Sequence, residues 1–352
     1  MLARVIGAGV AGLCAAYALA RAGLDVELVE REAAPGRGCS HYAGGMIAPW
    51  CELESAEPLV ARLGEEALDF WTREIGVATV AGSLVVAPPR ERAELPDFAR
   101  RTRAYETLDS QGVAALEPDL AGRFDRALYF PREAHLDPRA AMAELAARLA
   151  AAPNVVLRFG QDAGDLATQA DWTVDCRGLA ARDALSHLRG VKGEMLILRS
   201  DEITLSRPVR MLHPRRPAYV VPRGRGLFMV GATMIENEER ARVSARSVVE
   251  LVNSAFALHP AFAEAEIVEM GSDLRPAFPD NLPRLTKQGR SLYINGLYRH
   301  GFLLAPALAR RAMEVILHDA YFPEVMDAHK DQRESARGDR DHAADAARGI
   351  GL

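Results

Sequence analysis

Three glycines near the start of the chain have the spacing that binds a pyrophosphate. Gly7, Gly9 and Gly12 stand in VIGAGVAGLC, between a short apolar stretch and a helical pattern. The first permits a tight turn, the second lets the backbone approach a phosphate, and the third allows close packing of helix on strand. The N–H groups of Val10 and Ala11 would face the phosphates at the start of the helix. The stretch therefore predicts a dinucleotide site.

An acidic residue narrows the choice of dinucleotide. Glu30, followed by Arg31, ends the strand-like stretch DVELVE, where its carboxylate can accept from ribose hydroxyls and disfavours the 2′-phosphate of NADP. NAD and FAD both remain compatible. The next loop, PGRGCSHYAGGMIAPW, is small and polar enough to lie along a second pyrophosphate and the ribityl chain, which favours FAD. Its candidate cofactor contacts are Gly38, Cys39, Ala43, Gly44, Gly45 and Met46.

Two arginines stand inside apolar motifs later in the chain. Arg275 lies in DLRP and Arg299 in GLYRHGFLLAP. A planar guanidinium binds a carboxylate with two parallel hydrogen bonds, so either residue can hold an anionic substrate. From the residues alone, a solvated arginine in a loop before Pro276 is the commoner situation for Arg275. The residues around Arg299 that would reach the flavin are Leu297, His300, Gly301, Phe302 and Leu303.

The glycine motif must be positioned by strands on both sides of a helix. Apolar periodicity predicts strands at 3–6 and 25–30 around a helix at 10–22. The other expected elements before residue 180 are helices at 57–75 and 138–151 and strands at 82–88, 126–133, 153–158 and 172–176. The long segment 33–51 reads as a functional loop rather than a simple connection.

From residue 192 the pattern changes to short alternating runs separated by Pro, Gly and Arg. The runs at 193–200, 209–214, 218–224 and 227–233 are typical of an antiparallel sheet. A helix at 244–258 with Ser244 as its N-cap follows, then strands at 267–272 and 292–298 and a last helix at 305–317.

These elements predict an α/β plus antiparallel β protein: a Rossmann-type FAD-binding domain interleaved with an antiparallel-sheet substrate domain. The FAD-binding domain would be assembled from residues 1–80, 135–185 and 270–325, and the substrate domain from 81–134 and 186–269. The segment 327–352 is dense in charge and alanine, so it is expected to be a flexible tail.

Composition limits the partners. With 352 residues, 49% apolar and 26% charged, the chain can bury a sizeable core, and its net charge of -5 argues against nucleic acid. The four cysteines show no metal-ligand spacing, so we expect no metal and a reducing cytoplasm. The N-terminal apolar stretch also resembles a signal peptide, but the strand-like DVELVE after it favours the dinucleotide interpretation. No stretch approaches the length of a membrane span, so no membrane is expected.

Together, five motifs resemble the D-amino acid oxidase-type flavoproteins, and within them the glycine oxidase branch of thiamine biosynthesis. The motifs are the N-terminal glycines, GCSHYAGGMIAP, YVVPRGRGLFMVGATM, DLRPAFPDNLP and GLYRHGFLLAP, and they cover the chain to about residue 320. The resemblance implies noncovalent FAD, a small amino acid as substrate and O2 as the acceptor. Glycine, and sarcosine or small D-amino acids, would be oxidised to an imine with release of H2O2, and the imine would give glyoxylate or feed thiazole formation.

The resemblance also implies roles for individual residues. Arg275 would clamp the substrate carboxylate, with Arg299 as a second arginine near carboxylate and flavin, and Tyr219 and Met234 would form the pocket wall. Gly45 and Met46 would lie near the flavin ring, and Asp162 or Ala163 would contact the adenine side of FAD. By resemblance the protein would form a homo-oligomer, a tetramer.

Other functions fit part of the sequence. A D-amino acid dehydrogenase or a sarcosine oxidase would share the architecture, although no cysteine follows Cys176 to attach a flavin covalently near the last motif. A non-catalytic dinucleotide-binding module would keep the glycines but has no need of arginines in apolar motifs. A tRNA-modifying oxidase domain is disfavoured by the acidic net charge.

Overall fold

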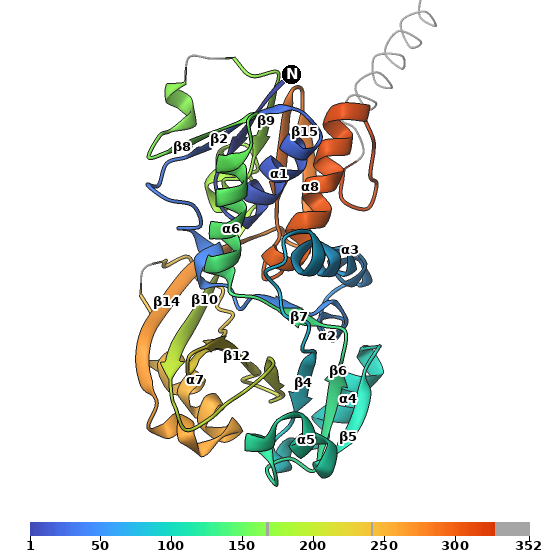
Figure 1. Ribbon diagram of the computed structural model, residues 1–352, viewed down its shortest axis with the longest axis vertical. Helices are drawn as coiled ribbons and strands as arrows, with labels where there is room; N and C mark the ends of the chain where they lie inside the picture. Colours follow the sequence, from blue (N-terminus) through green and yellow to red (C-terminus); the bar gives the residue numbers. More distant parts are fainter. Residues whose placement is uncertain (167–168, 241, 328–352) are drawn as a thin grey trace, which may run out of the picture.

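The computed structural model describes residues 1–166, 169–240 and 242–327. The segment expected to form a tail, 327–352, lies outside the described residues except for Asp327. The molecule is elongated, with one sheet in its upper half and a second in its lower half (Figure 1).

The first sheet has six strands in the order β15-β16-β9-β1-β2-β8, all parallel except β15. Its strands are β1 Leu2–Ile6, β2 Asp25–Glu30, β8 Val155–Phe159, β9 Trp172–Asp175, β15 Arg284–Gln288 and β16 Ser291–Asn295. Burial is nearly continuous along β1 and β2, as expected of parallel strands that are covered on both faces. The two buried charged residues, Arg4 and Glu27, pair with each other at 2.7 Å. Three distant parts of the chain therefore meet in one sheet.

Helices cover this sheet and complete its core. They are α1 Val10–Arg21, α3 Pro58–Asp69, α6 Pro138–Ala151 and α8 Gly301–His318. Buried side chains such as Leu13, Leu63, Leu145 and Leu304 join these helices and the strands in one apolar cluster. Asp137 caps α6 by accepting from the backbone N–H groups of its first turn.

The second sheet has eight strands in the order β14-β10-β13-β12-β11-β4-β6-β5, antiparallel except where β11 meets β4. Its strands are β4 Ser83–Val86, β5 Glu106–Asp109, β6 Arg126–Phe130, β10 Arg189–Arg199, β11 Val209–Met211, β12 Ala218–Gly224, β13 Leu227–Gly231 and β14 Glu266–Ala277. Alternating burial along β11 reflects one face packed on a core. The predicted fold class, α/β plus an antiparallel sheet, is confirmed.

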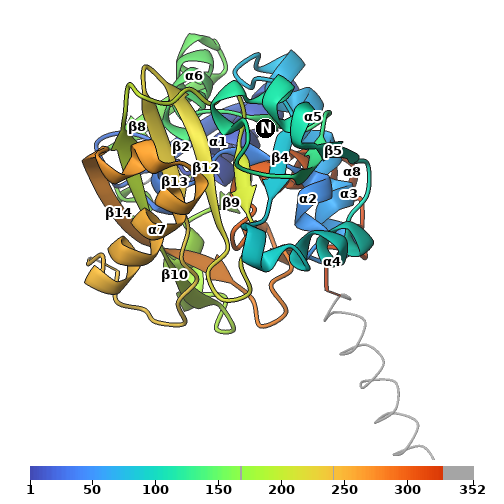
Figure 2. The same cartoon turned by 90° about the horizontal axis from the view of Figure 1, so that it is seen from below.

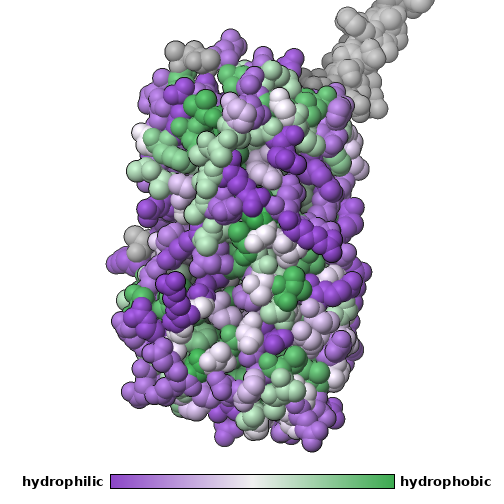
Figure 3. Space-filling model, in the orientation of Figure 1, coloured by the Kyte–Doolittle hydropathy of each residue, from purple (hydrophilic) through white to green (hydrophobic). Residues whose placement is uncertain are grey.

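Shorter elements complete the second half of the molecule. The helix α7 Ala245–Leu258 begins after Ser244, whose side chain accepts from Ser247 N as predicted. Figure 2 shows α7 beside β12 and β13, and α5 near β4 and β5. Helix α4 contacts β6. The remaining elements are α2 Pro49–Glu52, α4 Glu94–Arg101, α5 Ser110–Leu116 and the strand pair β3 Met46–Ile47 with β7 Ala134–His135. In Figure 3 apolar residues stand in small groups among polar ones on the face shown.

Several predicted boundaries were wrong. The last helix begins at Gly301 rather than 305 and includes Pro306 in its second turn. Strand β14 continues to Ala277 instead of ending at 272, so Arg275 is a strand residue paired with Val191, and not a loop residue. Strand β14 also crosses the boundary expected at residue 270, although the division into domains stays a prediction. The segment 33–51 contains β3 and α2, and α4, β5, α5 and β15 were not predicted.

Candidate active site

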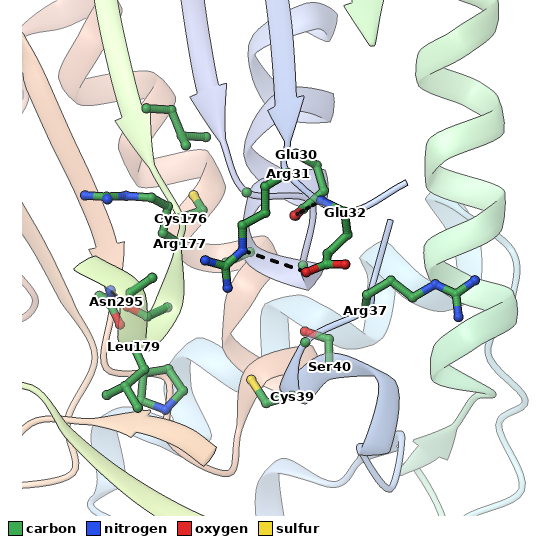
Figure 4. A pocket seen from close by; sticks show the side chains of 18 of the residues that line it. Glu30, Arg31, Glu32, Arg37, Cys39, Ser40, Cys176, Arg177, Leu179 and Asn295 are labelled. Atoms are coloured by element: carbon green, nitrogen blue, oxygen red, sulfur yellow. Dashed lines mark hydrogen bonds and ion pairs between the residues drawn. The ribbon is translucent and has the colours of Figure 1, made fainter. Parts of the chain in front are cut away.

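The larger of two adjacent cavities, about 630 Å³, lies at the carboxyl ends of the parallel strands β1, β2 and β9. This is where open α/β sheets bind dinucleotides. Figure 4 shows side chains from several parts of the chain around it, among them Glu30, Cys39 and Arg177. The predicted cofactor residues that line it are Gly7, Gly9, Val10, Ala11, Glu30, Arg31, Gly38, Cys39, Leu297 and Gly301.

The start of α1 is suited to an anionic group. Gly9, its N-cap, provides no side-chain cap, and the first turn contains no acidic residue. Gly7 has φ +97, and a Cβ there would come within 2.8 Å of the carbonyl oxygen of Cys176. Backbone N–H groups at a helix start attract phosphate. Gly12 lines neither cavity: a Cβ on it would come within 1.8 Å of Gly7 O, so its place is the packing of helix on turn.

The Glu30 carboxylate lines the larger cavity and also fixes the turns beside it. Its Oε2 accepts from Ala8 N at 2.7 Å and its Oε1 from Glu32 N at 3.0 Å. Each carboxylate oxygen can accept a further hydrogen bond, so the group keeps capacity for a ribose hydroxyl. Arg31 pairs with Glu32 at 3.8 Å (Figure 4). The segment 161–164, with the expected adenine-side contacts, lines the same cavity.

The smaller cavity, about 180 Å³, shares lining residues with the larger one. Residues common to both include Val10, Cys39 and Gly301, so the two cavities are adjacent. It brings together the four predicted substrate residues and the remaining cofactor candidates. Those that line it are Arg275, Arg299, Tyr219, Met234, Ala43, Gly44, Gly45, Met46, His300, Phe302 and Leu303.

Arg275 has an uncommitted guanidinium edge. Its Nη1 donates to Thr233 O at 3.0 Å and contacts Lys192 O at 3.5 Å, both backbone carbonyls. Among the described residues, its Nε and Nη2 have no hydrogen-bond partner and no carboxylate pairs with it. A cation without a counter-charge in a cavity is a natural partner for a carboxylate ligand.

Arg299 is in the opposite situation, because Glu52 neutralises it. Glu52 Oε2 lies 2.8 Å from Arg299 Nη2, and the other carboxylate oxygen accepts a short hydrogen bond from Arg210. Burial acts to raise the pKa of Glu52, but the two guanidinium groups outweigh burial and hold that pKa well below its usual value. One ionised carboxylate therefore serves two arginines, and the cluster retains one net positive charge.

His300 completes this cluster as a neutral side chain. Its Nε2 lies 2.8 Å from Glu52 Oε2 and 3.2 Å from Arg299 Nε. Since ionised Glu52 can only accept, Nε2 carries the hydrogen and donates to it, so the contact with Arg299 is no hydrogen bond. Burial lowers the pKa of His300, with Glu52 opposing. The buried Nδ1 is then an acceptor without a partner in the described chain.

The wall opposite is formed by Tyr219 of β12. Its ring packs on the loop at 43–45: a Cβ on Gly44 would come within 2.8 Å of the ring. Burial raises the pKa of Tyr219, so its phenol is neutral and can donate a hydrogen bond. Arg223, also buried, donates to the carbonyl oxygens of Ala43 and Gly44 at 3.1 and 2.9 Å and thereby fixes this loop.

The sequence predictions missed several residues that shape the site: Ser40, Glu52, Gly193, Arg210 and Arg223. Gly193 had a usable signal, because a glycine inside a strand often marks the close approach of another group. Glu52, in the apolar context APWCE, could have been flagged as a buried charge. The other three carried no local signal, since their partners come from distant segments.

Metal-ligand clusters and membrane-spanning helices are both absent from the described residues. Within residues 1–166, 169–240 and 242–327, no group of three or more His, Cys, Asp or Glu side chains is arranged to hold a metal ion. Over the same ranges, no helix combines the length and apolarity that crossing a membrane requires.

Comparison with known proteins places this geometry in context. A family model described as DAO, FAD dependent oxidoreductase, matches residues 4–315. A Rhizobium etli protein, to which its name assigns the role of thiamine biosynthesis oxidoreductase (ThiO), is 54% identical over 321 residues, covering 91% of this chain and 98% of that protein. Glycine oxidase of Bacillus licheniformis is 26% identical, covering 94% and 97%. The crystal structure of glycine oxidase from Bacillus cereus matches with TM-score 0.78 at 21% identity, covering 93% and 99%.

Proposed function

The chain belongs to the FAD dependent oxidoreductase family, and on that basis we propose that it is an FAD-dependent amine oxidase acting on glycine. In this reaction glycine, O2 and water give glyoxylate, ammonia and H2O2, or the imine passes on to thiazole formation in thiamine biosynthesis. The thiamine role rests on the 54% identical ThiO relative, and the substrate on the glycine oxidases.

The residues of the larger cavity fit FAD. The glycine turn and the start of α1 would hold the pyrophosphate, because backbone N–H groups at a helix start attract phosphate and the first turn has no acidic side chain. Glu30 would accept from the ribose. The loop at 43–46 and the residues 299–303, which lead into α8, would lie at the flavin end. No cysteine follows Cys176, so we expect the cofactor to be held noncovalently.

The open guanidinium edge of Arg275 carries the proposal. Nε and Nη2 form a fork without a partner in the described chain, which matches the two oxygens of an α-amino acid carboxylate. Tyr219 lines the same cavity with a neutral hydroxyl that can donate to that carboxylate. Bound FAD supplies the acceptor for the two electrons of the α C–H bond. Holding the carboxylate fixes where that bond points, which is how the protein lowers the barrier.

No side-chain base is needed if the substrate amine binds in its neutral form. His300 is the histidine that lines the cavity, and its Nε2 hydrogen is committed to Glu52. The net positive charge around Arg275, Arg299 and Arg210 favours loss of a proton from the substrate ammonium. The same charge would stabilise an electron-rich cofactor.

Small substrates suit this cavity. Its volume is about 180 Å³, and Met234 and Tyr219 occupy its wall. We infer a preference for glycine and sarcosine over amino acids with bulky side chains.

The proposal also covers the cellular location, the oligomeric state and the division into two units. All four cysteines are free thiols, which suits a reducing cytoplasm. We also propose a homo-oligomer. The FAD-binding unit would comprise residues 1–80, 135–185 and about 270–325, with the remaining strands as the substrate unit.

A peroxide assay across substrates tests the function. Purified FAD-bound protein is mixed in air with glycine, sarcosine, D-alanine or D-proline, and H2O2 is measured. The proposal expects the largest kcat/KM for glycine or sarcosine. Faster turnover of D-proline than of both would overturn the substrate assignment, and no peroxide from any of the four would overturn the activity.

A further inference from the structure

The sulfur of Met234 occupies an unusual position. Met234 follows β13, lines the smaller cavity and is 50% exposed. Its Sδ lies 3.4 Å from the hydroxyl of Tyr298 and 3.6 Å from Nη1 of Arg299. A thioether is only a weak acceptor, so two good donors face a poor partner.

Peroxide would form beside this sulfur, if the proposed function holds. Among the other sulfur atoms at the cavity, burial raises the pKa of the Cys39 thiol to about 11, which leaves it un-ionised and slow to react with peroxide. Met46 also lines the cavity but is less exposed, as part of the β3–β7 pair. A thioether needs no deprotonation, so Met234 is the most reactive accessible sulfur there.

We propose that Met234 is oxidised to methionine sulfoxide by H2O2 made in the same active site, and that the sulfoxide lowers turnover. The sulfur attacks one peroxide oxygen, an S–O bond forms and the O–O bond breaks. The hydroxide that leaves takes the proton of the transferred oxygen and becomes water. One thioether and one H2O2 thus give one sulfoxide and one water, and sulfur loses the two electrons that peroxide gains.

The surroundings stabilise the oxidised form. A sulfoxide oxygen is a strong acceptor, and Tyr298 and Arg299 already lie at the sulfur to donate to it. The added oxygen would draw Arg299 toward Met234 and reduce the free space of a cavity of about 180 Å³. Methionine sulfoxide is reversible by reductases, so accumulated peroxide would slow its own production until the residue is repaired.

The experiment uses the purified FAD-bound protein turning over glycine in air, with catalase in solution to remove peroxide that escapes. Peptide mass spectrometry measures sulfoxide at Met234 and at Met270, which is 56% exposed on β14 and lines neither cavity. We expect on the order of tenfold more sulfoxide at Met234 than at Met270, with activity falling in step. Methionine sulfoxide reductase should restore the activity.

Two variants separate this chemistry from general damage. Met234→Leu, whatever its starting rate, should keep that rate through many turnovers, whereas Met270→Leu should decline like the wild type. Equal oxidation of Met234 and Met270, or undiminished decline in Met234→Leu, would overturn the inference. If glycine gives no peroxide in a parallel assay, the proposed function fails and the oxidant with it. If peroxide forms but Met234 stays unoxidised, only the present inference fails.

Discussion

The guanidinium of Arg275 lies directly over the backbone of Gly193, so close that any side chain at position 193 would overlap it. A Cβ on Gly193 would come within 2.1 Å of Arg275 Nη2 and 2.2 Å of its Cζ. The two residues are diagonal neighbours on the β10–β14 pair, where Gly193 is opposite Asp273 and Arg275 is opposite Val191. The strand glycine therefore makes room for the group that we propose to bind the substrate carboxylate.

Gly193→Ala should displace Arg275 while leaving the sheet intact. Because a shift of about 1 Å in a positioning group can cost about 10²-fold, we expect kcat/KM for glycine to fall by that order with FAD still bound. Steady-state kinetics and the flavin spectrum measure both. In an Arg275→Ala background the same change should have almost no further effect. Full additivity of the two losses would show that Gly193 acts by another route.

Glu52→Gln should destabilise the fold, because the two partly buried arginines Arg210 and Arg299 lose the counter-charge of a buried carboxylate. Breaking a buried pair costs about 3 kcal/mol or more, and denaturant unfolding would measure the loss in the free energy of unfolding. Glu54→Gln is the matched control: Glu54 also lines the cavity but pairs with exposed Arg101 at 3.3 Å, so its loss should cost under about 1 kcal/mol. Equal losses in the two variants would contradict the role of Glu52.

Glu133 should make stability depend on pH. Its Oε1 accepts from Trp50 N and Cys51 N at the start of α2, and Oε2 has no partner in the described chain. Burial raises its pKa from 4.5 to about 7. The folded state thus holds the proton more tightly than the unfolded state, and this stabilisation is present below about pH 4.5 and lost as pH rises through about 7.

Glu133→Gln removes that dependence. As pH rises from 4.5 to 7, the free energy of unfolding of the wild type should fall relative to that of the variant, by up to about 1.4 kcal/mol per pH unit. Denaturant curves at several pH values measure it. A difference that stays constant over this range would contradict the buried, protonated carboxyl.

His300→Gln should retain most of the activity, because the Nε2 hydrogen of His300 is committed to Glu52 and its Nδ1 is buried, out of reach of a substrate in the cavity. A general base typically accelerates a reaction by about 10²–10⁴-fold. Since His300 is not expected to act as one, kcat/KM for glycine should fall by less than about tenfold. The pH profile of kcat/KM should keep its acid limb. A loss beyond a hundredfold together with disappearance of that limb would assign His300 the role of base.

Local patterns predicted the elements around the dinucleotide turn well. Strand β2 and helix α6 have the predicted bounds, because the apolar residues Val26, Leu28 and Val29 and the capping Asp137 specify them locally. The segment with α4, β5 and α5 was missed, since each is short and its apolar positions are few. Secondary-structure propensity is a poor predictor of short helices and strands that are stabilised mainly by tertiary packing.

The site was predictable only where residue type and motif coincide. The arginines in apolar motifs pointed to the smaller cavity, and all four predicted substrate residues line it. Glu52 could not be paired from the sequence, because its partners Arg210 and His300 lie 158 and 248 residues away. The strand position of Arg275 was also missed, since Pro276 suggested a loop. Pairing partners depend on the fold and not on spacing.

Anaerobic mixing of the FAD-bound protein with glycine tests the central claim, that Arg275 holds glycine for oxidation by the flavin. Loss of the oxidised-flavin absorbance is followed against glycine concentration. Wild type should bleach, and Arg275→Ala, with its initial flavin spectrum unchanged, should need about 10²-fold more glycine, which corresponds to about 3 kcal/mol. Absorbance that glycine leaves unchanged in wild type, or bleaching of Arg275→Ala at the wild-type glycine concentration, would contradict the account.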